Sequence, residues 1–259
     1  MNTFREAITT MIEGEARETV GHLSSAQDAR AVAAVALSAY RRAESVHLPM
    51  VETLACKRGC AWCCRGIKVD VTVPEAVLIA EFLRWSLSAE HFQAIADEIR
   101  EAARVAQTMT IDQRWQAQTP CPLLDEESGT CLVYQVRPMR CRGHNSTNAD
   151  ACALAARNPT KSLGVPVDQN FKGFYDAMTA GQVEGMRRAN ADDRTFELSN
   201  ALSVAMTAEN AAVRWQRGER VFDVAHYTIE DEEESHRRAV DAISRRKQNE
   251  RKRAKQGRS

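Results

Sequence analysis

Residues 56–64 read CKRGCAWCC, which places Cys56, Cys60, Cys63 and Cys64 within one short stretch. The short gap from Cys60 to Cys63 lets one tight turn aim two sulfurs at a single ion, as zinc and iron–sulfur sites require. After 56 intervening residues the other cysteines follow, at Cys121, Cys131, Cys141 and Cys152. No cysteine lies outside these two groups. This concentration predicts a thiolate metal site rather than scattered cysteines of the core.

The compartment expected for the chain favours metal binding over disulfides. The first residues, MNTFREAITTMIEGEARE, are charged throughout and lack the apolar segment of a secretory signal, so we expect a cytoplasmic protein. No apolar run approaches the roughly 18 residues that cross a bilayer. Disulfides are rare in the reducing cytoplasm, so the eight cysteines are better explained as metal ligands than as four disulfides. The formal net charge of +0 gives no general attraction to nucleic acid or anionic membranes.

The sequence around the first cysteine group is mostly helical in pattern. Residues 1–50 predict two helices, the second at about 28–45 with Asp28 as its cap. The β-branched run IKVDVTV predicts a strand at 67–73, and Thr72 is placed to cap a following helix that begins at Pro74. Further helices are expected at about 88–107, 151–158, 171–190 and 195–206, with a last piece ending at Gly218.

The second cysteine region predicts a hairpin followed by a loop. Residues 121–134, CPLLDEESGTCLVY, form two short apolar arms around a polar turn that contains Gly129. Pro138 interrupts the chain, and residues 140–152 are expected to be a loop. The fold class is therefore mainly α: a helical domain with a cysteine-rich metal-binding loop core and a short β-hairpin-like element.

Three parts of the chain are expected. Residues 1–50 are an N-terminal helical extension, and residues 51–225 are the cysteine-cluster domain. Residues 226–259 form a charged tail, and its basic segment 245–258 leaves contact with nucleic acid open, although a solvated end is the commoner outcome. We expect no membrane contact, and a protein partner is left open.

The number of metal centres is left open by the cysteine count. Zinc and a [4Fe–4S] cluster each take four thiolates, so eight cysteines allow two sites, or one site with four supporting thiols. Neighbouring side chains of an extended chain point to opposite faces, so Cys63 and Cys64 can serve two adjacent centres, or one of them can be a packed thiol that binds no metal.

Basic residues surround both cysteine groups, and residues 56–68 and 131–144 contain no Asp or Glu. Nearby cations offset the negative charge that thiolates leave on a metal centre. The basic residues are Lys57, Arg58, Arg65 and Lys68 in the first group, and Arg137, Arg140 and Arg142 in the second.

These motifs resemble the CxxCxxCC cysteine-cluster family of YkgJ-like zinc- or iron-chelating proteins. The resemblance lies in CKRGCAWCC, in VDVTVPEA at 69–76, and in CPLL and GTCLVYQVRPMRCR at 121–124 and 129–142. It covers about residues 54–152. The first gap holds three residues rather than the two of the family's name. The resemblance implies Cys56, Cys60, Cys63, Cys64, Cys121, Cys131, Cys141 and Cys152 as metal ligands. It implies zinc or an iron–sulfur cluster, and a related cluster occurs in a flagellin lysine methylase.

Two function hypotheses follow. The first is a metal-binding protein with a structural or partner-binding role; the second is an iron–sulfur-dependent enzyme, either redox or methylase-like. Cys56, Cys60 and Cys63 also fit the three-cysteine signature of radical-SAM enzymes, but the segment before them is helical and no βα-barrel pattern follows, which makes that chemistry less favoured. His144 is a weaker candidate ligand. No catalytic residue is identified, so enzymatic activity is left undecided.

Overall fold

The computed structural model describes residues 2–225, and its architecture is mainly helical. The longer helices are α1 (Asn2–Ser25), α2 (Ala29–Ser45), α3 (Val73–Ser86), α4 (Ala89–Ala106), α8 (Gln169–Arg188) and α9 (Leu198–Thr207). The shorter helices are α5 (Ile111–Ala117), α6 (Met139–Gly143), α7 (Ala149–Arg157) and α10 (Ala211–Gln216). Four 3-10 turns complete the described helical structure: η1 (Pro49–Thr53), η2 (Cys63–Arg65), η3 (Tyr134–Val136) and η4 (Val221–Ala225).

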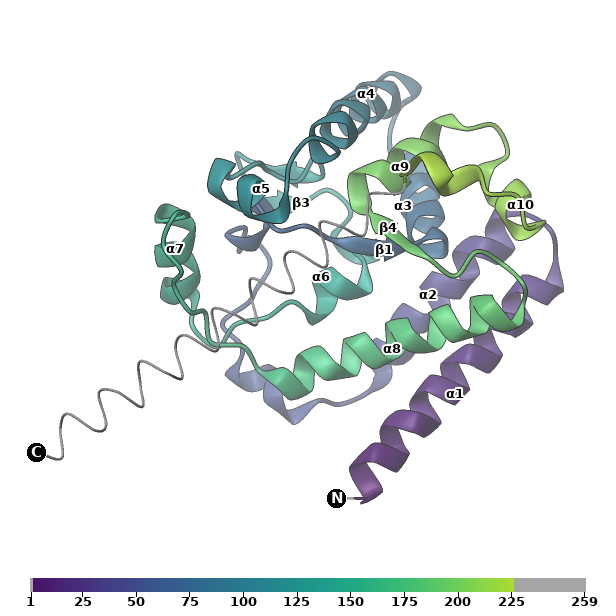
Figure 1. Cartoon of the computed structure of the whole chain (residues 1–259), viewed down its shortest axis with the longest axis horizontal. Helices are drawn as coiled ribbons and strands as arrows, with labels where there is room; N and C mark the ends of the chain where they lie inside the picture. Colours follow the sequence, from purple (N-terminus) through teal and green to yellow (C-terminus); the bar gives the residue numbers. More distant parts are fainter. Residues whose placement is uncertain (1, 226–259) are drawn as a thin grey trace, which may run out of the picture.

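Two small antiparallel strand pairs join distant parts of the chain. Strand β1 (Asp70–Thr72) pairs with β4 (Thr195–Glu197), and β2 (Leu124–Asp125) pairs with β3 (Thr130–Cys131). Each member of the first pair runs directly into a helix, β1 into α3 and β4 into α9. Figure 1 shows the two strands side by side at the centre of the molecule. This pairing aligns two strand–helix units that lie more than a hundred positions apart in the sequence.

Helix α3 lies at the centre of the hydrophobic core. Residues 73–80 are all buried, and a run of this length makes more than two helical turns, so every face of the helix is covered. Helices α2, α4 and α9 pack around it. A capping box starts the helix: the Thr72 hydroxyl accepts from the Glu75 amide, and the Glu75 carboxylate accepts from the Thr72 amide.

Helices α1 and α8 approach each other closely because α8 presents glycines at the crossing. A Cβ atom on Gly181 would lie 2.5 Å from the Glu15 Cβ, and one on Gly185 would overlap the Thr19 Cβ. Neither position has room for a side chain. Figure 1 shows the two helices running side by side along one edge of the molecule.

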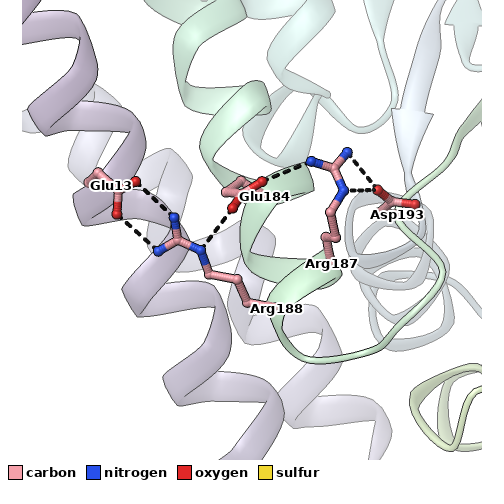
Figure 2. Close-up of polar contacts among 5 residues, drawn as sticks. All are labelled: Glu13, Glu184, Arg187, Arg188 and Asp193. Atoms are coloured by element: carbon pink, nitrogen blue, oxygen red, sulfur yellow. Dashed lines mark hydrogen bonds and ion pairs between the residues drawn. The ribbon is translucent and has the colours of Figure 1, made fainter.

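A chain of ion pairs runs along the same crossing, as Figure 2 shows. Arg188 donates to both oxygens of Glu13 on α1 at 2.8 and 2.9 Å, and to Glu184 on its own helix at 2.9 Å. Arg187 bridges Glu184 and Asp193, which lies in the segment after α8. These side chains are 30–62 % exposed, so solvent screens the ion pairs, which contribute little to stability and mainly fix the register of α1 on α8.

The predicted mainly α fold and the short hairpin at 121–134 are confirmed, and so are the caps at Asp28 and Thr72. Among residues 2–225, no helix is long and apolar enough to cross a membrane. The division of the chain at residues 50 and 225 stays a prediction, and the charged tail lies outside the described residues.

Two local predictions are wrong. The expected loop at 140–152 contains the end of α6 and the start of α7, because Pro138 suits a helix start and the Asn148 side chain caps α7 by accepting from the Ala151 amide. The segment expected as one helix from Thr195 begins as strand β4, because its first residues pair with β1.

We predict that Gly185→Ala lowers the free energy of unfolding by about 1–3 kcal/mol, because the new methyl group overlaps Thr19 and the Ala16 carbonyl. Gly173→Ala is the matched control on the same helix, where a Cβ would meet no atom within 4 Å, and it should be neutral or slightly stabilising. Urea unfolding of both variants measures the difference. Equal stability of the two would contradict the close crossing.

Candidate metal centre

The eight cysteines come from six separate pieces of backbone. Cys56 and Cys60 lie in the loop between η1 and η2, and Cys63 and Cys64 form the first two positions of η2. The second group is spread over more elements: Cys121 precedes the hairpin, Cys131 ends β3, Cys141 lies in α6 and Cys152 lies in α7. All eight are free thiols.

Tertiary structure brings the two groups to one cavity of about 230 Å³. Seven of the cysteines line it: Cys56, Cys60, Cys63, Cys64, Cys121, Cys131 and Cys141. Cys152 does not line the cavity, but it lies near enough to Cys56 to influence its charge. Among residues 2–225, no three His, Cys, Asp or Glu side chains are already arranged to hold one metal ion.

Backbone contacts hold the two cysteine groups together. The Cys121 amide donates to the Cys64 carbonyl at 2.8 Å, and the Ala55 amide donates to the Ser146 carbonyl at 2.8 Å. The two turns also touch directly: Gly59 and Gly129 both have positive φ angles, and a Cβ on Gly129 would lie 3.1 Å from the Gly59 carbonyl oxygen. Glycine is therefore required where the hairpin meets the first cysteine loop.

Several thiols accept backbone N–H groups, which are the donors that stabilise a thiolate. The Ser146 amide lies 3.3 Å from the Cys56 sulfur. The Leu123 amide donates to Cys121, and the Val133 amide donates to Cys131. These hydrogen bonds hold the sulfurs in place and stabilise their thiolate form, as a site for a thiophilic metal requires.

Burial works in the opposite direction and favours the protonated thiols. It raises the pKa of Cys121 to about 12, and it also raises the pKa of Cys131 and Cys141 above that of a free thiol. In the adjacent pair, the hydrogen bond between the thiols lowers the pKa of Cys64 and raises that of Cys63. A metal cation that replaces these protons removes the cost of burying thiolate charge, which couples its binding to proton release.

Arg137 is the cation best placed to balance the thiolates. It lines the cavity, and its positive charge lowers the pKa of Cys56, Cys64, Cys131 and Cys141 against the larger effect of burial on most of them. Its guanidinium carbon lies 4.4 Å from the centre of the Tyr134 ring, which holds the side chain in place. Of the basic residues expected to balance the thiolate charge, Arg137 therefore has the largest part.

The other basic residues of the second group have structural roles. Arg142 is buried and donates to the Arg137 carbonyl at 2.8 Å and the Gln135 carbonyl at 2.6 Å, and it also pairs with Glu44 on α2. Arg140 points to Asp176 on α8, at 2.9 Å. In the first group, Arg65 pairs with Glu126 of the hairpin at 2.6 Å, which links the two groups again.

Glu75 positions the part of the site that carries Cys141. Its buried carboxylate accepts from the Met139 amide at 2.8 Å and from the Tyr40 hydroxyl at 3.1 Å, so it attaches the start of α6 to α3 and α2. Burial raises the pKa of Glu75, and its four hydrogen bonds from backbone and side chains partly offset that effect. The pattern Thr72-x-x-Glu75 signals the local cap, but nothing in the sequence signals the contact with Met139.

A buried ion pair forms another wall of the cavity. Arg114 donates to Glu197 at 2.7 Å, and both side chains are at least nine-tenths buried. Glu197 also caps α9 by accepting from the Asn200 amide at 3.0 Å. Sequence reasoning missed this pair, because 83 positions separate the partners and neither lies in a cysteine motif.

Two further residues of the sequence analysis have clear positions. Trp62 packs under Arg157 of α7, with 5.2 Å from the guanidinium carbon to the ring centre. His144 follows α6 and lines the cavity, so it remains a candidate beside the thiols rather than an established ligand.

Residues 55–160 match the CxxCxxCC family model, whose description is "Putative zinc- or iron-chelating domain". This segment is a CxxCxxCC domain. It contains all eight cysteines, so the resemblance seen in the sequence is confirmed. No curated protein and no solved structure matches the chain significantly. Lining residues from outside the matched segment complete the cavity of the CxxCxxCC domain: Val51, Leu54, Phe171, Glu197 and Leu198.

We predict that Arg114→Met lowers the free energy of unfolding by about 3–5 kcal/mol, because it leaves Glu197 buried without its cation. The double variant Arg114→Met/Glu197→Gln should recover part of that loss, since no uncompensated charge remains. Arg104→Met, which breaks an exposed pair with Glu101, is the control and should leave the unfolding temperature unchanged. A wild-type unfolding curve for Arg114→Met would show that the pair does not stabilise this wall.

Proposed function

We propose that this chain is a metal-binding protein whose CxxCxxCC domain holds zinc or an iron–sulfur cluster through cysteine thiolates. One observation carries the proposal: seven cysteines from two distant parts of the sequence line the same cavity. Thiolate sulfur is the donor that both zinc and iron–sulfur clusters prefer. Amide donors to three sulfurs and the charge of Arg137 add what such a centre needs around it.

The proposed ligands are the eight cysteines, Cys56, Cys60, Cys63, Cys64, Cys121, Cys131, Cys141 and Cys152. A bound metal adds bonds between the loop 56–64 and the hairpin region to the hydrogen bonds and the ion pair that already join them. We assign it a structural role that presents this face to a protein partner. Reduced thiols suit a cytoplasmic location, because disulfides form and persist in oxidising compartments.

An iron–sulfur-dependent enzyme, redox or methylase-like, is the second candidate. It is favoured by the extent of the cavity, which continues past the thiols to Ile67, Val69 and the Arg114–Glu197 pair. A purely structural zinc site is closed on all sides. Radical-SAM chemistry is less favoured, because the described residues contain two short antiparallel strand pairs and no βα barrel.

The direct test of the proposed function is the metal content of protein purified without oxygen. We expect at least about one equivalent of zinc or iron per chain, by elemental analysis. A colourless protein with zinc supports the structural role, and a brown protein with acid-labile sulfide and visible absorption supports the enzyme. Less than about a tenth of an equivalent of either metal, with all thiols titratable, would contradict the proposal.

Limited trypsin digestion tests the metal as a clasp between loops. Lys57 and Arg58 are exposed in the first cysteine loop, so chelation of the metal should speed cleavage there by about tenfold or more, as the loop opens. Arg104, exposed on α4 and distant from the cysteines in sequence, is the internal control and should be cut at an unchanged rate. Far-ultraviolet circular dichroism should fall little, since the helices pack on their own core. Equal cleavage rates at Lys57 with and without metal would show that the cysteines do not clasp the loop.

A further inference from the structure

We propose that the cysteines form two separate four-thiolate centres, an inner centre and an outer centre, with the boundary between Cys63 and Cys64. The inner centre consists of Cys64, Cys121, Cys131 and Cys141. The outer centre consists of Cys56, Cys60, Cys63 and Cys152. This inference rests on the proposed function and assigns each thiol to one of two metals.

The inner group is assembled around Cys64. The Cys121 amide donates to the Cys64 carbonyl at 2.8 Å, which places these two residues side by side. Cys131 lies opposite Leu124 in the hairpin that Cys121 begins. The charges of Cys64, Cys121 and Cys131 all raise the pKa of Cys141, so these three sulfurs lie near it. These contacts bring four thiols from four parts of the backbone into one group, which a metal would draw together.

The outer group is assembled where α7 meets the first cysteine loop. Helix α7 contacts η2, and Arg157 of α7 stacks on Trp62, which lies between Cys60 and Cys63. This packing brings Cys152 of α7 to the same loop. The charges of Cys60 and Cys152 raise the pKa of Cys56, so these sulfurs lie near it. Cys56 in turn raises the pKa of Cys63. The Ser146 amide, in the segment before α7, donates to the Cys56 sulfur.

The turn η2 separates the two groups. Successive residues of a 3-10 helix are rotated by about 120°, so the Cα–Cβ bonds of Cys63 and Cys64 leave the turn in different directions. Their sulfurs are near enough to share a hydrogen bond, and Cys63 also lies near Cys141, so two centres divided at this pair would be adjacent. Adjacent cysteines at this position thus give each centre its fourth ligand, and a single turn holds both.

The environments of the two groups differ. Cys121, Cys131 and Cys141 pack against the hydrophobic core, and Arg137 and the buried Arg114 face them. Cys56 is exposed, and Cys60 follows the exposed residues Lys57 and Arg58. Water and chelators therefore reach the outer centre first. We expect the outer metal to be exchangeable and the inner metal to be retained.

Metal analysis of serine variants tests the division. Cys121→Ser and Cys152→Ser should each lose half of the wild-type metal. A second substitution in the same group, as in Cys152→Ser/Cys60→Ser, should cause no further loss. The cross-group double variant Cys121→Ser/Cys152→Ser should lose nearly all of it. Wild-type metal content in Cys152→Ser, or complete loss in each single variant, would overturn the two-centre assignment.

A second measurement uses the wild-type chain, because an inner variant that fails to fold gives no metal count. Metal-loaded protein is treated with a chelator, alkylated with iodoacetamide at intervals, and digested for mass spectrometry. Cys56, Cys60, Cys63 and Cys152 should be alkylated together in a first phase, and the other four in a later phase. One rate for all eight, or early labelling that mixes the groups, would overturn the assignment.

The two proposals fail differently. If the wild-type chain binds neither zinc nor iron, the proposed function is wrong. If it binds metal but loses all of it in a single step on chelation, the function holds and the division into two centres is wrong.

Discussion

The carboxylate of Glu75 is the contact on which the arrangement of the rest depends. It lies in the core, caps α3, and accepts hydrogen bonds from Tyr40 on α2 and from the amide of Met139 at the start of α6. Burying a carboxylate is costly unless its oxygens are satisfied, and here they are. One group thereby fixes three helices relative to one another. The element that carries Cys141 is fixed with them, which sets where the second cysteine region meets the first.

The cysteines of the CxxCxxCC domain therefore depend for their positions on residues outside that domain. Glu44 on α2 pairs with the arginine that holds the loop before α6, and Glu197 on β4 pairs with Arg114 at the wall of the cavity. Both glutamates lie outside residues 55–160. The N-terminal helices and the strand–helix unit of β4 and α9 thus shape the site, although no cysteine lies in them. A cysteine motif placed without these elements would lack two of its supports.

Burial and the nearby positive charge act in opposite directions on the thiols, and a bound metal would satisfy both. The thiols are partly or fully removed from water, Arg137 faces four of them, and residues 56–68 and 131–144 contain no Asp or Glu. Burial keeps the thiols protonated, while the arginine and the amide donors favour the thiolates. A divalent cation or an iron–sulfur cluster resolves this opposition, because it replaces the protons with a charge that the sulfurs bind directly. The cavity beside the thiols leaves room for the chemistry of the second candidate function.

The sequence by itself determined the local features: the helices of the N-terminal half, the caps at Asp28 and Thr72, the hairpin between Cys121 and Cys131, and the family of residues 55–160. These follow from periodicity, capping and turn chemistry within a few residues. Tertiary structure alone decided that β4 is a strand, that Cys141 lies in a helix, α6, and which arginine faces the thiols. Each of these depends on partners tens of positions away, such as the pairing of Val71 with Phe196 or of Glu75 with Met139, and no local pattern records such contacts.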